Sequence, residues 1–157
     1  MAATEYVAKL RNREAIKELR YRYGRSIDSR SWDEFLDLFT DDATCTYVGL
    51  GRFTGREELR ELAEDYIESN YEYTCHLFHH PILEVDGDEA TGSWLLEALL
   101  AHHDGTFEWR QGRYTDDYRR VDGEWKFAGV ALESEAVHEQ EFDLVDHEAY
   151  GRIPRVR

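Results

Sequence analysis

Apolar residues in the first third of the chain recur at helical spacing. Between about 5 and 27 they are separated mostly by three or four positions, as on one face of an amphipathic helix: Val7, Leu10, Ile16, Leu19, Tyr23 and Ile27. Ser31 can cap a second helix, and Asp41-Asp42 predicts the turn that ends it. The buried stripe of this second helix consists of Trp32, Phe35, Leu36 and Phe39. We therefore expect the chain to open with a helical hairpin.

Residues 43–54 predict two short strands joined by a turn at 49–51, and Gly55 precedes a third helix through Leu59, Leu62, Tyr66 and Ile67. From Tyr71 onward the pattern changes to strands over 73–85, 89–103, 106–121 and 124–134. Asp-Gly dipeptides at 86–87, 104–105 and 122–123 separate these strands and are strong hairpin signals. The predicted class is α+β, with N-terminal helices packed on a curved, mostly antiparallel sheet to form a cone.

Composition fits one compact domain without a membrane segment. The 157 residues are 41% hydrophobic, and the 13% aromatic share suits a deeply concave domain walled by flat side chains. A net charge of −15 disfavours nucleic-acid binding, and together with only three lysines it indicates either adaptation to high salt or simply an acidic protein from a GC-rich genome. No stretch approaches the roughly 18 apolar residues of a membrane span. We expect a cytoplasmic protein that binds neither nucleic acid nor membrane.

Four polar residues form the candidate catalytic set: Tyr23, Asp28, Tyr47 and His76. Removing a proton next to a carbonyl requires a base and donors that stabilise the developing enolate oxygen. His76 suits the base, Asp28 can hold its other ring nitrogen, and the two phenols can polarise the carbonyl. A hydroxyl on the β carbon would then leave as water, without metal or organic cofactor.

Each of these residues also has a purely structural interpretation. Tyr23 lies on the apolar stripe of the first helix, Tyr47 suits a strand, and His76 can be a satisfied buried histidine. Asp28 follows Tyr23 by five residues, so the two share a pocket only if the helix ends or bends near Ser26. Asp28 can otherwise serve a turn.

Four segments of the chain resemble a known family: LRYRYGRSIDSRSWDEFLDLFTDDATCTY at 19–47, GRFTGREEL at 51–59, TCHLFHHPILEVDGDEATGSW at 74–94 and GRYTDDYRRVDGEWKF at 112–127. They are similar to the SnoaL-like branch of the nuclear transport factor 2-like superfamily, which includes scytalone dehydratase and the bacterial bile acid 7-alpha dehydratase. The resemblance implies a single cone domain over 1–135. The tail at 136–157 would cover the pocket or pack on a neighbouring subunit.

The same resemblance places the dehydratase pocket tyrosine, carboxylate, second phenol and histidine at Tyr23, Asp28, Tyr47 and His76. It also implies a further histidine on the next strand, at His102 or His103, and a homodimer or homotrimer formed through the outer sheet face. The expected function is a cofactor-independent dehydratase acting on a small hydrophobic ring-containing substrate. The candidate substrate walls, which serve equally well as plain core, are Trp32, Phe53, Phe78, Trp94, His102 and Trp109.

Three other functions remain as alternatives. A ketosteroid isomerase-like enzyme takes its base from a carboxylate on the early strand, and residues 43–51 contain none. A polyketide cyclase or a non-catalytic small-molecule-binding module could share the pocket. A metal site is disfavoured because adjacent histidines on a strand point to opposite faces and no ligand spacing is recognisable.

Overall fold

The structure, a computed structural model, describes residues 3–147 and 151–156, with side chains described up to residue 139. The helices are α1 (Ala3–Asp28), α2 (Trp32–Asp37), α3 (Gly55–Glu61), the π-helical segment η1 (Leu62–Ile67) and α4 (Glu68–Asn70). The strands are β1 (Phe39–Tyr47), β2 (Gly51–Thr54), β3 (Tyr71–Asp86), β4 (Glu89–His102), β5 (Thr106–Val121), β6 (Glu124–His147) and β7 (Gly151–Val156).

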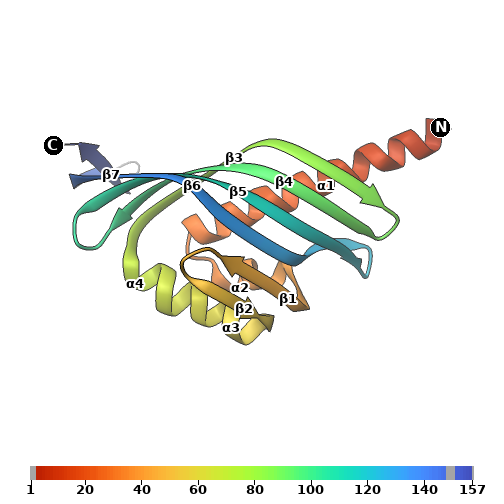
Figure 1. The fold of residues 1–157 in the computed structure, drawn as a ribbon, viewed down its shortest axis with the longest axis horizontal. Coiled ribbons are helices and arrows are strands. Elements are labelled where there is room, and N and C mark those ends of the chain that lie inside the picture. The colour runs from red at the N-terminus through yellow and green to blue at the C-terminus, as the bar shows by residue number, and fades with distance from the viewer. Residues whose placement is uncertain (1–2, 148–150, 157) are drawn as a thin grey trace.

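A curved open sheet with helices on its concave side forms the domain, which confirms the predicted α+β class (Figure 1). The strand order is β2-β1-β6-β5-β4-β3, and β7 pairs with β6. Strands β3 to β6 form an antiparallel meander, whereas β1 joins β6 in parallel. The predicted turn glycines at 87, 105 and 123 all have positive φ, which is the conformation that favoured glycine there.

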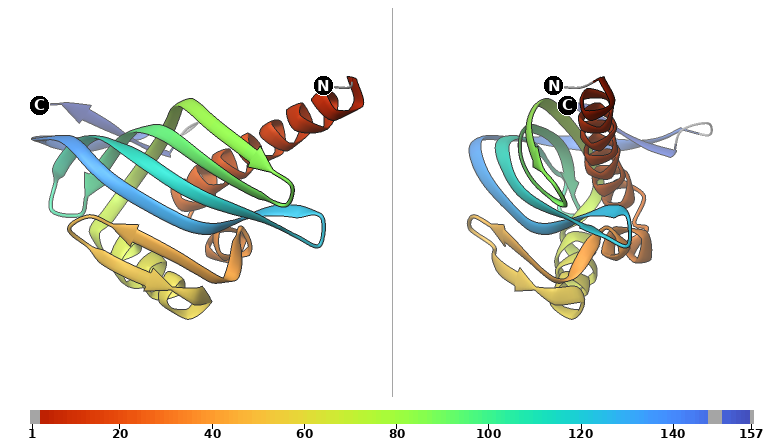
Figure 2. Two further views of the ribbon diagram at one scale, coloured as in Figure 1. Left: turned by 45° about the vertical axis from the view of Figure 1, so that its right-hand side comes forward. Right: turned by 90° about the vertical axis from the view of Figure 1, so that its right-hand side faces the viewer.

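Helix α1 packs along the sheet, while the shorter helices and the β1-β2 hairpin lie below it (Figure 2). The first half of α1 projects beyond the sheet and is largely exposed, and its second half buries Ile16, Leu19, Tyr23 and Ile27. The main core therefore lies between the C-terminal half of α1 and the concave face of the sheet. No helix in the described part of the chain is long and apolar enough to cross a membrane.

The second helix is shorter than predicted. It ends at Asp37, Phe39 already belongs to β1, and Asp41 and Asp42 are exposed strand residues rather than a turn. The reason is an irregularity in the β1–β6 pairing between Phe39 and Thr44, which breaks the apolar-polar alternation of the strand. Ser31 occupies the N-cap position without a side-chain capping hydrogen bond.

The last predicted strand is also longer than expected. Instead of ending at 134, β6 runs to His147, and its backbone pairs with β5 up to the Thr106–Glu141 position. Residue 135, the expected boundary between domain and tail, thus lies inside a continuous strand. The covering or subunit-packing role of 136–157 stays a prediction, and residues 148–150 and 157 lie outside the described residues.

Gly24 allows α1 to approach β3 closely beside the candidate site. A Cβ atom at this position would lie 2.6 Å from Cε2 of Phe78 and 3.3 Å from Cβ of His76. The glycine is therefore required by the close approach of helix and strand, although glycine is a poor helix former.

We predict that Gly24→Ala destabilises the protein. Overpacking against Phe78 costs roughly 1–3 kcal/mol, which exceeds the ~0.5–1 kcal/mol that alanine gains in helix propensity. Denaturant unfolding should show a lower free energy of unfolding than for Arg22→Ala, an exposed control on the same helix. Equal or higher stability of Gly24→Ala would contradict the packing argument.

Candidate active site

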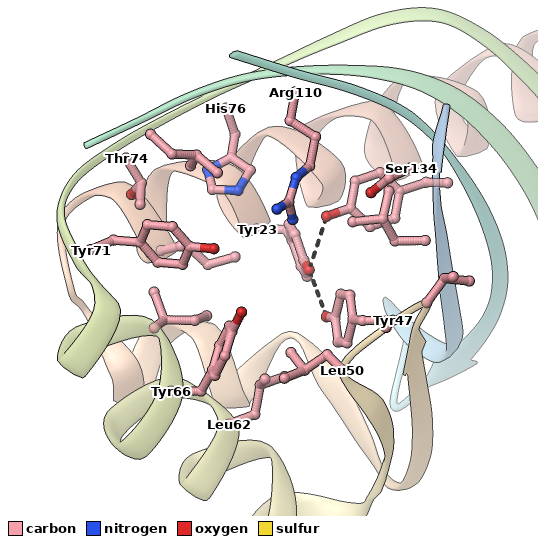
Figure 3. A pocket seen from close by; sticks show the side chains of 17 residues that line it. Tyr23, Tyr47, Leu50, Leu62, Tyr66, Tyr71, Thr74, His76, Arg110 and Ser134 are labelled. Atoms are coloured by element: carbon pink, nitrogen blue, oxygen red, sulfur yellow. Dashed lines mark hydrogen bonds between the residues drawn. The ribbon is translucent and has the colours of Figure 1, made fainter. Parts of the chain in front are cut away.

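A cavity of about 270 Å³ opens between the end of α1, η1, the β1-β2 turn and the concave sheet face (Figure 3). This volume lies just below the range of roughly 300–1,000 Å³ typical of small-molecule sites. The lining residues are Tyr23, Ile27, Tyr47, Val48, Gly49, Leu50, Leu62, Tyr66, Ile67, Tyr71, Thr74, His76, Leu100, Arg110, Tyr114, Leu132 and Ser134.

An Asp28–His76 pair lies on one side of this cavity. Oδ1 of Asp28, the last residue of α1, is 2.6 Å from Nδ1 of His76 on β3. Oδ2 accepts the backbone N–H of His76 at 2.9 Å. With Nδ1–H donated to the carboxylate, Nε2 is the ring nitrogen left as an acceptor. Figure 3 shows the imidazole pointing into the cavity, so the pair presents a base there.

The Asp28 carboxylate is held by a second layer of donors. Thr74 Oγ1 donates to Asp28 Oδ1 at 2.9 Å, and Arg30 Nη1 donates to Thr74 Oγ1 at 2.8 Å. Arg30 also donates to the carbonyl oxygens of Ile27 and Tyr71. Its backbone has φ 59°, which turns the chain back after α1. This arrangement fixes the end of α1 against the start of β3.

Three phenols form a hydrogen-bonded cluster on another wall. The hydroxyl of Tyr23 is 2.8 Å from that of Tyr47 and 3.5 Å from that of Tyr114. Burial raises the pKa of all three; Tyr114 and Tyr47 add to this for Tyr23, whereas Cys45 and Tyr114 add to it for Tyr47. Tyr47 is also hydrogen-bonded to the Cys45 thiol, so the hydroxyl protons of the cluster are shared among the phenols, this thiol and a ligand. At neutral pH the cluster is a neutral hydrogen-bond donor.

A sealed ion pair lies behind these phenols. The guanidinium of Arg20 contacts the carboxylate of Asp116, and both side chains are fully buried. Arg20 Cζ is 4.5 Å from the ring centroid of Tyr23 and 4.3 Å from that of Tyr114. Burial opposes the charge of Arg20, but Asp116 and the surrounding phenols raise its pKa above its usual range. A permanent positive charge therefore supports the rings of the cluster.

Two further phenols come from the opposite side, where the helical segment meets the sheet. Tyr66 belongs to η1 and Tyr71 begins β3, and Figure 3 shows both hydroxyls directed into the cavity. Burial and a hydrogen bond with Tyr66 raise the pKa of Tyr71 above its usual range. π-Helical segments are rare and frequently occur at functional sites, and Leu62, Tyr66 and Ile67 of η1 all line this cavity.

Arg110 supplies the cationic group of the cavity wall. Its Nε is 2.6 Å from Oε1 of Glu108, two residues earlier on β5. Glu108 is only 2% exposed, and its Oε2 lies 3.1 Å from Nε2 of His102. The guanidinium reaches into the space between His76 and Tyr23 in Figure 3.

The predicted catalytic residues are brought together, although not as a direct cluster. Tyr23, Tyr47 and His76 line the cavity. Asp28 lies behind His76 and contacts it directly. For Tyr23 and Asp28 to share a pocket, α1 would have to end or bend near Ser26. The helix instead continues two residues further and ends at Asp28. Asp28 thus contacts His76 and does not share a wall with Tyr23.

The predicted substrate walls lie elsewhere, and none is among the lining residues. Phe78 and Trp94 pack edge to face in the core, and Trp94 donates to Tyr118. Trp109 is outward on β5, where its Nε1 donates to Glu97. The reason is strand register: inward positions of β5 are the even-numbered residues, Glu108, Arg110 and Tyr114 among them.

The other three predicted wall residues, Trp32, Phe53 and His102, make polar or packing contacts outside the cavity. Trp32 is buried and donates to Glu68, and Phe53 packs against Tyr47 from outside the cavity. His102 pairs with Glu108. His103 does not line the cavity, and its ring contacts the carbonyl oxygen of Glu68. The expected second pocket histidine is therefore replaced, on the neighbouring strand, by Arg110.

Several lining residues were not predicted: Tyr66, Tyr71, Thr74, Arg110 and Tyr114. The two-residue alternation of side chains along β5 places Glu108, Arg110 and Tyr114 on one face of the strand, but it does not predict which face is concave. Tyr66 was predicted as part of a helix stripe, where its cavity position cannot be distinguished from core. The histidines are dispersed, since His79 meets Glu97 and His102 meets Glu108.

The fold is similar to that of an NTF2-like protein with a cystatin-like fold from Novosphingobium aromaticivorans (TM-score 0.67, 22% identity, 85% of this chain and 90% of that chain). The chain belongs to the SnoaL-like domain family, whose sequence profile matches residues 8–131.

Hexachlorocyclohexane dehydrochlorinases are among the similar proteins. Dehydrochlorinase 1 of Sphingobium indicum is 29% identical over 122 residues, covering 76% of this chain and 79% of that protein. The crystal structure of a type 2 dehydrochlorinase superposes with TM-score 0.81 at 26% identity, covering 85% of this chain and 92% of that chain. The family of this chain therefore includes lyases.

Two other relatives carry less functional information. An uncharacterized protein of Mycobacterium tuberculosis is 31% identical over 85 residues, which are 54% of this chain and 58% of that protein. A Novosphingobium aromaticivorans protein provisionally named scytalone dehydratase has TM-score 0.77 at 22% identity, covers 95% of this chain and 96% of that chain, and shows the fold.

We predict that the three clustered phenols resist alkaline ionisation. Their pKa values are raised in the folded state, so their contribution to stability is complete below the ordinary tyrosine pKa of about 10 and is lost as pH rises through the folded values. Ultraviolet titration of the folded protein should show the same early phase of tyrosine ionisation in Tyr23→Phe as in the unmodified protein. Early ionisation of Tyr23 would contradict this assignment.

Proposed function

We propose that this protein is a cofactor-independent lyase in which His76 is the general base. The observation that carries the proposal is the Asp28–His76 hydrogen bond, which fixes one ring nitrogen and leaves the other facing a ring-sized cavity. A carboxylate in this position orients the imidazole and stabilises the imidazolium that forms after proton transfer. Membership of a family that includes dehydrochlorinases supports the same class of reaction.

The finer reaction we propose is loss of water from the carbon β to a carbonyl. Nε2 of His76 takes a proton from the carbon next to the carbonyl, and the C–H electrons move to form the enolate. The phenol cluster of Tyr23, Tyr47 and Tyr114 donates to the enolate oxygen. Collapse of the enolate forms the C=C bond and breaks the C–O bond, with the leaving oxygen protonated as water.

The leaving-group proton has two sources in this geometry. Tyr66 and Tyr71 place hydroxyls on the side of the cavity away from the three-phenol cluster, and the imidazolium of His76 holds the proton just removed. Transfer of this proton from His76 to the leaving oxygen requires that oxygen to lie on the same face of the substrate as the abstracted hydrogen. Delivery by Tyr66 or Tyr71 suits a leaving group on the opposite face.

Loss of hydrogen chloride is a second candidate, favoured by the 29% identity to a dehydrochlorinase. Chloride leaves without a proton, so this reaction would use His76 and Asp28 without an acid. Isomerisation has less support, because the carboxylates of β1, Asp41 and Asp42, are exposed and do not line the cavity. A non-catalytic binding module would need no oriented base at all.

We predict that His76→Ala lowers kcat for water loss from cyclic β-hydroxy ketones by about 10²–10⁴-fold, the usual contribution of a general base. Asp28→Asn should lower kcat less, because its amide oxygen can still accept from Nδ1 but carries no charge. Tyr23→Phe should lower kcat by up to about 10²-fold through loss of the central phenol. Absorbance of the conjugated enone product follows the rate.

His79→Ala is the matched control, since His79 lies on the same strand, half exposed beside Glu97. It should retain the activity of the unmodified protein. Chlorinated cyclohexanes are assayed in parallel by chloride release. Turnover of neither substrate class, or turnover that His76→Ala leaves unchanged, would remove His76 from the role of base.

A further inference from the structure

We propose that Arg110 is a binding site for a carboxylate group of the substrate, so that the cavity takes small ring-containing carboxylic acids. This inference rests on the proposed function, because it concerns the same cavity and names the class of substrate. It adds an anionic group to a substrate expected from the sequence to be simply hydrophobic.

The charge of the cavity wall is the first argument. Among the seventeen lining residues there is no Asp, Glu, Asn, Gln or Lys, and Arg110 is the one lining residue with a fixed charge. Asp28 is separated from the cavity by His76. A guanidinium has five donors and no acceptor, so its partner in the cavity must be an acceptor. The other polar groups of the wall are hydroxyls and one imidazole.

The way in which Arg110 is held is the second argument. Glu108 engages Nε at 2.6 Å, and Figure 3 shows the terminal end of the guanidinium directed into the cavity. The contact is an ion pair without a hydrogen bond at Nε, and the edge formed by the two terminal amino groups is the one that can meet a carboxylate through two parallel hydrogen bonds. Glu108 thus positions Arg110 for end-on recognition.

The burial of Glu108 is the third argument. Its side chain is 3% exposed and meets Arg110 and His102, and a buried ion pair of this kind is often no more stabilising than apolar residues of similar size. A charged pair at the cavity wall is therefore poorly explained by stability alone. It is explained if the pair holds a cationic group against a ligand.

The net charge of the protein is the fourth argument, because binding an anionic ligand would need a local cation in the cavity. The chain carries a net charge of −15, so an anionic ligand approaches against the overall field. A fixed cation in a cavity whose lining residues carry no other fixed charge offsets that repulsion where the ligand binds, beside the apolar side chains of Ile27, Leu62, Leu100 and Leu132. The bound ring would contact these apolar residues while its carboxylate meets Arg110.

Titration calorimetry with unreactive probes tests the proposal without any turnover. Benzoate, cyclohexanecarboxylate and 1-naphthoate are compared at neutral pH with their uncharged primary amides. We expect each carboxylate that fits to bind roughly 10- to 100-fold more tightly than its amide, the range for hydrogen bonds to charged groups. Arg110→Gln should abolish this preference, and Arg110→Lys should keep part of it.

Arg113→Gln is the matched control, because Arg113 lies on the same strand, points outward and pairs with Glu135. It should retain the full preference. If Arg110→Gln fails to fold with Glu108 left unpaired, the double variant Glu108→Gln/Arg110→Gln removes both charges together and should also lose the preference. Circular dichroism establishes folding of each variant.

Equal binding of carboxylates and amides, no binding of any of the six probes, or a preference that survives in the folded double variant would overturn the proposal. The outcome is separable from that of the lyase proposal. His76→Ala should keep the carboxylate preference while losing turnover. Turnover without the preference would overturn the Arg110 site alone, and the preference without turnover would overturn the lyase alone.

Discussion

The site depends on one carboxylate at the end of a helix. Asp28 is the last residue of α1, where the helix dipole disfavours a negative charge. Donors from β3 offset this cost: the backbone N–H of His76, the imidazole Nδ1 of His76 and the hydroxyl of Thr74. Because these contacts join the helix to the strand, the same carboxylate that orients the imidazole of His76 also sets where α1 meets the sheet. Packing and chemistry are fixed by one group.

Strand β5 carries two buried charge pairs that differ in their access to the cavity. The Arg20–Asp116 pair is fully enclosed, with the guanidinium stacked among aromatic rings. The Glu108–Arg110 pair lies further along the same face, and its arginine lines the cavity. Alternation places Glu108, Arg110, Tyr114 and Asp116 on the concave side of this strand. Strand β5 thus supplies Asp116, the partner of the Arg20 charge that α1 places behind the phenols, and also Arg110, the charge that lines the cavity.

The fold was largely predictable because its signals are local. Asp-Gly turns and helical spacing require only neighbouring residues, and both were read correctly over most of the chain. The parallel pairing of β1 with β6 and the long β6 depend on distant partners, so sequence periodicity missed them. For the site, residue chemistry and family resemblance identified Tyr23, Tyr47 and His76 as residues that the structure places at one cavity. Their roles remain predictions.

The predicted substrate walls do not line this cavity, because aromatic content does not report the direction in which a side chain points. Trp94 and Phe78 fill the core, and Trp109 is on the convex face, since a shift of one residue in register exchanges the two faces of a strand. The actual wall is made by medium-sized aliphatic residues and by tyrosines whose hydroxyls point inward.

The distribution of phenols divides the proposed reaction between two sides of the cavity. Burial keeps Tyr23, Tyr47 and Tyr114 protonated, and the Arg20 guanidinium behind them favours an ionised oxygen nearby. Such groups are suited to stabilise a developing oxyanion without giving up a proton. Tyr66 and Tyr71 stand apart from that charge, on the π-helical segment and the adjoining strand end. In the proposed reaction, Tyr66 of η1 and Tyr71 at the start of β3 would protonate a leaving group on their side of the cavity, while the proposed base and oxyanion donors come from α1 and the sheet.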